Sequence, residues 1–196
     1  AGSISAAGIE SLGLINVSNY TVDNISTFAK SISFAATASL DEISMTGYDS
    51  SHLQNMVKNI SASSTSSLGL ISVEGYDVSQ LGGALEGVIF GVTSALDEIS
   101  ADSSSSRGSY KVSGYSASKL GDLLNQITSA STGVLGDIEM DSFTSDNLSF
   151  LSEKITDGAI SGIEEISMNG FTSDNVSELM RNITKGVVSA IDEINK

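Results

Sequence analysis

One short phrase recurs along this chain at a fixed interval, and this periodicity constrains the fold more than any other feature. The phrase alternates apolar and polar residues, then has a small residue and an aromatic ring. Its copies start at Ile15, Ile43, Ile71, Tyr110, Ile138, Ile166 and Ile194. The interval is 28 residues, except between Ile71 and Tyr110, where it is 39, so 11 residues are inserted there. Copies in such close register indicate a tandem array in which each repeat is one structural unit.

The first part of each repeat has the pattern of a short β-strand. Apolar and polar residues alternate in the segments 43–48 and 71–76, and a period of two is typical of a half-buried strand. Gly47 and Gly75 stand where the chain would leave this strand, a place that often requires positive φ.

The second part of each repeat has the pattern of an amphipathic helix of about 16–18 residues. Directly after the aromatic ring comes a residue type that favours helix N-caps. These N-cap candidates are Thr21, Asp49, Asp77, Ser116, Thr144 and Thr172. Small residues gather in the second half of the helix and would let neighbouring helices approach closely. They include Ala35, Gly91, Ala130, Gly158 and Gly186.

Strand followed by helix in every repeat predicts an α/β tandem-repeat solenoid of 28-residue units, with a parallel sheet on one side and helices on the other. The chain then forms a single repeat domain over residues 1–196. It divides into a half repeat 1–14, repeats 15–42, 43–70, 71–98, 110–137, 138–165 and 166–193, an insertion 99–109, and a strand start 194–196.

The junction between two repeats resembles a known family. The segments Leu40-Asp-Glu-Ile43-Ser-Met45 and Ile163-Glu-Glu-Ile166-Ser-Met168 resemble the L-x-x-L-x-L core of leucine-rich repeats, and the 28-residue period resembles their ribonuclease-inhibitor-like class. The resemblance implies a horseshoe-shaped fold and a protein-binding role. It departs from the family where leucine-rich repeats carry an asparagine ladder. The aromatic residues found there are Tyr20, Tyr48, Tyr76, Tyr115, Phe143 and Phe171. We expect a buried structural stack of rings, and the alternative is a strip that binds carbohydrate or a partner.

The chain is strongly acidic, with a formal net charge of −15. This charge argues against nucleic acid and against anionic membranes as partners, because both are bound by clustered Lys and Arg. There is no cysteine, which excludes disulfides and thiolate metal sites. The Ser-, Thr- and Asn-rich composition is typical of secreted or cell-surface proteins, and several Asn-x-Ser/Thr triplets are glycosylation acceptors only if the chain passes through such a pathway. No apolar run is long enough to insert into a membrane.

Acidic residues at the repeat junctions are the only candidates for a metal site. In a stacked array they would lie about 5 Å apart, and Ca²⁺ would relieve their repulsion. The calcium candidates are Asp41, Glu42, Asp97, Glu98, Glu164 and Glu165. A solvated acidic face is the alternative. His52 is the only histidine and is expected at the surface. The common nucleophile–base pairs are therefore unavailable, and we expect no enzymatic activity and no cofactor other than, at most, calcium.

The chain begins and ends within a repeat, which predicts either a piece of a longer array or subunits that complete each other head to tail. We therefore expect a non-enzymatic extracellular or cell-surface structural protein that associates with itself into a filament, or forms part of a long adhesin-like array. The alternative is a recognition module that binds a protein or glycan on a concave acidic face, and the insertion would then mark a binding surface.

Overall fold

The computed structural model describes residues 2–15, 21–42, 50–72, 74–99, 116–138, 144–168 and 170–194. These residues form seven α-helices, four of which run on into a short 3₁₀ helix. The α-helices are α1 (Gly2–Glu10), α2 (Val22–Ala38), α3 (Ser50–Leu68), α4 (Val78–Ser94), α5 (Ala117–Gly133), α6 (Ser145–Glu164) and α7 (Ser173–Ile194). The 3₁₀ helices are η1 (Ser11–Leu14), η2 (Ser39–Glu42), η3 (Ala95–Glu98) and η4 (Val134–Asp137).

The predicted helix starts are confirmed wherever the structure describes them. At α6 the side chain of Asn147 accepts a hydrogen bond from the Thr144 backbone N–H at 2.8 Å, and Thr144 Oγ1 accepts one from the Asn147 N–H at 3.3 Å. This reciprocal pair is a capping box with Asn in the place of the usual Glu or Gln. Equivalent contacts begin α2 and α7, and the Asp77 carboxylate caps α4. The remaining candidate, Asp49, lies outside the described residues.

The Leu-x-x-Ile junction is a turn of 3₁₀ helix, and our strand prediction for it is wrong. In each described junction the second apolar residue donates its backbone N–H to the carbonyl of the first, as in Ile99 to Leu96 at 3.3 Å and Ile138 to Leu135 at 3.3 Å. Residues three apart eclipse each other in a 3₁₀ turn, so both apolar side chains face the core. Leu96 and Ile99 are accordingly both buried.

The predicted α/β solenoid is therefore wrong, and with it the resemblance to leucine-rich repeats. No β-strand and no sheet occur in the described parts of the chain, including residues 74–76 and 166–168 of two predicted strands. The segment in which apolar and polar residues alternate is too short for this pattern to distinguish a strand from a helix that ends with two buried residues. The concave sheet face, on which the alternative function placed its acidic binding surface, disappears as well.

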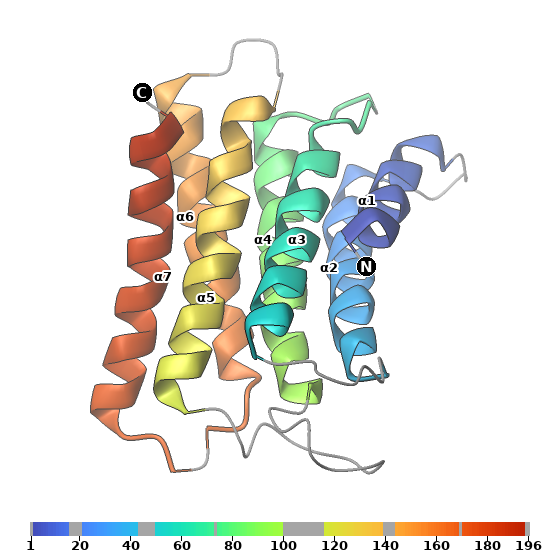
Figure 1. Ribbon diagram of the computed structural model, residues 1–196. Helices are drawn as coiled ribbons and strands as arrows, with labels where there is room; N and C mark the ends of the chain where they lie inside the picture. The colour runs from blue at the N-terminus through green and yellow to red at the C-terminus, as the bar shows by residue number, and fades with distance from the viewer. Residues whose placement is uncertain are drawn as a thin grey trace.

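The helices form two layers, which Figure 1 shows one in front of the other. One layer contains α1, α3, α5 and α7, and the other contains α2, α4 and α6, so each helix packs mainly against the helix two repeats away. Successive helices are antiparallel: α3 ends and α4 begins at one end of the molecule, whereas α6 ends and α7 begins at the other (Figure 1). The architecture is thus an all-helical stack with a two-helix repeat.

Contacts within a layer keep the sequence register of the repeat. Hydrogen bonds between α2 and α4, or between α5 and α7, join residues 55 or 57 positions apart. Across the insertion, the bonds between α3 and α5 join residues 66 and 70 positions apart. A nearly constant separation along a helix pair means that the two helices are parallel. These separations correspond to two 28-residue repeats, and the insertion adds to the separation of the α3–α5 pairs, between which it lies. We call residues at the same point of the repeat equivalent.

The core lies between the layers and is aliphatic. Its largest fully buried side chains are isoleucines and leucines from all seven α-helices and from η3 and η4, and α4 at the centre of the stack is buried along most of its length. No member of this group is aromatic. Aliphatic side chains fill the space between layers, whereas small and hydroxylated residues fill the space between helices of one layer.

Candidate functional site

A hydroxyl group at one repeat position links neighbouring helices within a layer. Ser33 Oγ lies 3.2 Å from the Val88 carbonyl oxygen, Ser61 Oγ 3.3 Å from that of Ile127, and Thr128 Oγ1 3.3 Å from that of Ile183. Ser33 and Thr128 share their hydroxyl hydrogen with a closer carbonyl of their own helix, at 2.7 and 2.9 Å. The three donors are equivalent to one another, and so are the three acceptors. All three donor residues are buried. In α2, α3 and α5, this one side-chain position therefore joins the helix to the helix two repeats on.

The residue that lies opposite this hydroxyl is small in every repeat. It is glycine in three helices, namely Gly91, Gly158 and Gly186. A Cβ added at Gly158 would lie 2.5 Å from the Glu86 carbonyl oxygen, and one at Gly186 would meet Thr128 Oγ1. The backbones of parallel helices thus approach too closely for a larger side chain. The expectation that small residues permit close helix approach is confirmed here.

A charged and aromatic strip runs beside these contacts on the layer of α2, α4 and α6. Lys30 on α2 places its ammonium 3.6 Å from the centre of the Phe90 ring on α4, within the range of a cation–π interaction. Lys154 on α6 donates to Glu86 on α4 at 2.9 Å and also lies 3.6 Å from Asp157. The hydrogen bond to Glu86 and the negative charges of Glu86 and Asp157 raise the pKa of Lys154, against a smaller opposing effect of its burial.

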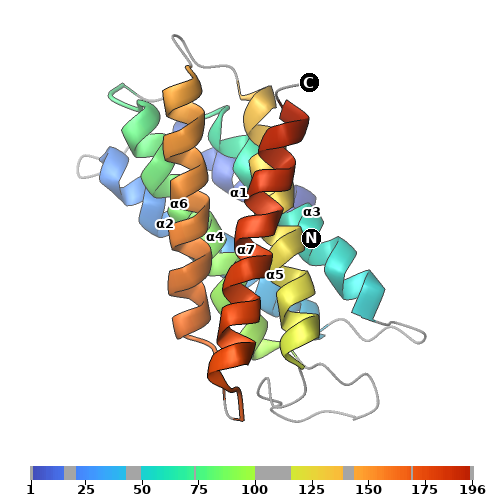
Figure 2. The same cartoon turned by 90° about the vertical axis from the view of Figure 1, so that its left-hand side faces the viewer.

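The two ends of the stack expose faces that are covered inside it. Figure 2 shows α6 and α7 side by side at one end, and α1 and α2 lie at the other (Figure 1). On the outer side of α2 lie Thr27, Ser31 and Ala35, all exposed. They are equivalent to Gly83, whose carbonyl accepts a hydrogen bond from Ser26 on α2, and to Gly87 and Gly91, which pack closely on α2. Large apolar side chains are also exposed at these ends, including Ile4 at 76 % and Val188 at 52 %.

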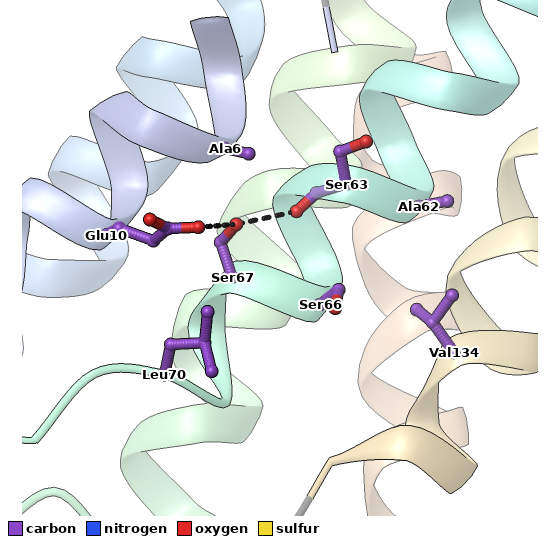
Figure 3. Close-up of a pocket in the computed structure, with 8 residues that line it drawn as sticks. All are labelled: Ala6, Glu10, Ala62, Ser63, Ser66, Ser67, Leu70 and Val134. Atoms are coloured by element: carbon purple, nitrogen blue, oxygen red, sulfur yellow. Dashed lines mark hydrogen bonds between the residues drawn. The ribbon is translucent and has the colours of Figure 1, made fainter. Parts of the chain in front are cut away.

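The structure has a shallow recess of about 330 Å³ on the outer surface of α3, between α1 and η4. Figure 3 shows Glu10 and Ser67 pointing toward each other there, and Ser67 Oγ lies 3.2 Å from Glu10 Oε1. The other residues that line it are Ala6, Ala62, Ser63, Ser66, Leu70 and Val134. Glu10 is the only titratable residue among them, so the recess holds no acid–base pair or nucleophile–base pair for general catalysis.

The calcium candidates lie at one end of a single layer. Asp41, Asp97 and Glu164 are equivalent residues at the C-terminal ends of successive helices of that layer, and Glu98 and Glu165 follow them, both exposed. Glu42 ends η2. Asp97 accepts a hydrogen bond from the Ser167 backbone N–H at 3.0 Å. Neighbouring helices stand about 8–10 Å apart, wider than the strands from which the calcium argument began. Among the described residues, no three acidic or histidine side chains are grouped closely enough to hold a metal ion.

Only part of the aromatic ladder lies within the described residues. Tyr76 and Phe171 are half-buried and pack against the core in the turns that precede α4 and α7. Tyr20, Tyr48, Tyr115 and Phe143 lie outside the described residues, as does nearly all of the insertion 99–109. His52 is exposed in the first turn of α3, as expected. The asparagines of three Asn-x-Ser triplets, Asn24, Asn147 and Asn175, have a structural role as capping residues.

The hydroxyl position that joins neighbouring helices was not predicted from the sequence. The signal was present: reading the chain at the repeat interval from Ser5 gives Ser33, Ser61, Ile89, Thr128, Thr156 and Thr184. In so serine-rich a chain these residues do not stand out until the helices that they join are known.

No model of a known protein family matches the sequence, and no curated protein is significantly similar to it. In the described part of the chain, no helix combines the length and the apolar character that crossing a membrane requires.

Proposed function

We propose that this chain is a non-enzymatic structural repeat protein of the cell surface or extracellular space, and that its copies associate end to end into a filament. The observation that carries the proposal is that equivalent residues make up the exposed faces at the ends of the stack and the covered faces within it. A helix inside either layer has its two lateral faces covered by parallel neighbours of the same repeat. A second copy of the chain supplies such a parallel neighbour to the uncovered face of an end helix.

The composition of the outer faces supports association. Ile4, Phe28 and Val188 lie at the ends of the stack, and 43 % or more of each is exposed. Burying such side chains stabilises a contact by roughly 25 cal/mol per Å² of apolar surface removed from water. Two different faces that fit each other, rather than one self-complementary face, generate an open chain of subunits.

Light scattering and negative-stain microscopy of the purified chain, over a concentration series, test the proposal. We expect the apparent mass to rise with concentration and the images to show unbranched polymers with a repeat near the length of one subunit. The same concentration series with added calcium tests whether the acidic candidate residues bind Ca²⁺, because a bound ion would alter the apparent mass or the thermal stability of the protein. A species that stays monomeric at high concentration would contradict end-to-end association.

A further inference from the structure

We propose that the junction between two copies continues the internal register of the stack, with α2 of a second copy packed on α7 of the first and its α1 packed on α6. This inference rests on the proposed function and specifies its contacts. The described residues hold seven helices, and successive helices alternate between layers. The first helix of a second copy therefore takes the eighth place, in the layer of α6. Its α2 takes the ninth place, in the layer of α7.

The first element of the junction is the interhelix hydroxyl. Thr184 on α7 and Thr156 on α6 are equivalent to Ser33, Ser61 and Thr128, which donate to the helix two repeats on. In the structure Thr184 donates to the Met180 carbonyl of its own helix at 3.0 Å and Thr156 to the Ser152 carbonyl at 3.0 Å, as Ser33 and Thr128 do within their helices while also reaching a neighbouring helix. The carbonyls equivalent to the internal acceptors belong to Ile32 and Ile4. In the junction, Thr184 donates to Ile32 of the second copy, and Thr156 to its Ile4.

The second element is the small residue opposite that hydroxyl. Inside the stack, Gly91 faces Ser33, and Gly186 faces Thr128. At the junction the equivalent pair is Ala35 of the second copy and Thr184 of the first, and both positions are exposed. Ala130 of α5 is the equivalent residue in the α3–α5 contact, so a pair of helices with alanine at this position packs inside the stack.

The third element is a cation over an aromatic ring. Lys30 lies over the ring of Phe90 between α2 and α4. The residue equivalent to Lys30 on α7 is Arg181, which is exposed, and the residue equivalent to Phe90 on α2 is Phe34, which is half-buried. The same register therefore places Arg181 over Phe34 of the second copy, in a geometry that guanidinium groups favour.

Disulfide cross-linking tests this register, because the chain has no cysteine of its own. We would prepare Thr184→Cys and Ala35→Cys as separate variants, mix them, oxidise them mildly and separate the products on a non-reducing gel. A Cβ at Gly158 would lie 3.0 Å from Ile89 Cβ at the equivalent internal contact. This is shorter than the roughly 3.5–4.5 Å between the Cβ atoms of a disulfide, so the two cysteines come within bonding reach once the helices separate slightly. A covalent dimer in the mixture is expected, with little in either variant alone. Thr184→Cys mixed with Ser118→Cys, an exposed position on α5, is the matched control.

The outcomes separate the register from the proposed function. If light scattering detects polymers but the mixture does not cross-link above the control, the register is wrong while the filament stands. Cross-linking of Ala35→Cys with itself would mean a face-to-face contact and would also overturn the inference. If no association of any kind is detected, both proposals fall.

A blocking variant gives a second, independent measurement. Ala35→Gln adds bulk to the outer face of α2 without adding charge and preserves helix propensity. It should raise the concentration needed for half-association about 10-fold or more, which corresponds to about 1.4 kcal/mol. Ser66→Gln, at an exposed position of α3 away from both ends, should leave that concentration unchanged. Equal association of both variants would contradict the proposed contact.

Discussion

At the scale of single residues, buried hydroxyls fall into two groups that sequence cannot separate. Ser33, Ser61 and Thr128 bond across to a neighbouring helix. Four other equivalent threonines are fully buried or nearly so, and their hydroxyls have no hydrogen-bond partner within the described residues. They are Thr37, Thr65, Thr93 and Thr132. A buried polar atom without a partner loses its hydration and gains nothing in exchange.

Replacing Thr93 by Val should therefore leave stability unchanged or raise it by about 1 kcal/mol, because the isosteric methyl needs no partner. Thr128→Val removes the hydroxyl that reaches the Ile183 carbonyl and should lower the free energy of unfolding by about 1 kcal/mol. Urea unfolding followed by circular dichroism measures both. A loss at Thr93 as large as that at Thr128 would show that the Thr93 hydroxyl has a partner in solution.

Two glycines of α4 provide a matched test of close packing. Gly91→Ala should destabilise the fold by about 1–3 kcal/mol, because its Cβ would meet the Lys30 carbonyl oxygen and lie 3.0 Å from the Phe34 nitrogen. At Gly83 nothing lies within 4 Å of an added Cβ, so Gly83→Ala should stabilise the helix by roughly 1 kcal/mol. Thermal unfolding of the two variants checks the sign of each change. The same sign for both would argue against the close α2–α4 contact.

At the scale of helices, residues close together in the sequence determine where a helix starts, whereas residues far away in the sequence supply the helix on which it packs. The capping residues lie within a few positions of each other, and the 3₁₀ turn that ends four of the helices closes within a single Leu-x-x-Ile segment or its equivalent. The lateral contacts of a helix, by contrast, come from the helix two repeats away. The pair of Lys154 and Glu86 is one such contact, and its charges make it sensitive to pH.

The contribution of Lys154 should be present at neutral pH and disappear in strong alkali. Because its folded pKa is raised, the protonated form favours the folded state below the ordinary lysine pKa of about 10.4. The stabilisation is lost as pH rises through the folded pKa. We expect Glu86→Gln to be less stable than the parent chain at pH 8, by less than about 1 kcal/mol since the pair is partly exposed. This difference should shrink as the pH rises past the ordinary lysine pKa of about 10.4. A difference that persists there would mean that packing, rather than charge, is responsible.

At the scale of the whole molecule, a layered stack with open ends carries a net charge of −15. Every copy repels every other at long range, while the proposed junction depends on small residues, apolar side chains and few charges. Charge repulsion is screened over a Debye length of about 10 Å at 0.1 M salt. The balance between repulsion and short-range packing therefore sets when copies associate.

Raising NaCl from about 0.02 to about 0.3 M should promote association and lower the concentration at which polymers form, because screening weakens the repulsion between acidic subunits. Light scattering across a salt series at fixed protein concentration is the measurement. Polymers that dissociate as salt rises would instead indicate a junction held mainly by opposite charges, and would argue against the contacts proposed for α2 and α7.

The sequence by itself determined the repeat interval, the helix starts at residues such as Thr144 and Asp77, and the small-residue positions such as Gly158. These features are local or strictly periodic, so hydrogen-bond chemistry within a few residues and spacing along the chain are sufficient to reveal them. The strands predicted at the junctions were wrong, because a buried pair such as Leu68 and Ile71 fits a 3₁₀ turn and a strand start equally well over so few residues.

Only the tertiary structure decided that the repeats alternate between two layers, and that Ser33 bonds to α4 rather than to its own turn alone. Both facts depend on contacts between residues about two repeats apart. Such contacts form only when the aliphatic faces of successive helices bury one another and bring parallel helices together. The same tertiary arrangement turns Thr184 and Ala35, inconspicuous in the sequence, into the two sides of a proposed junction.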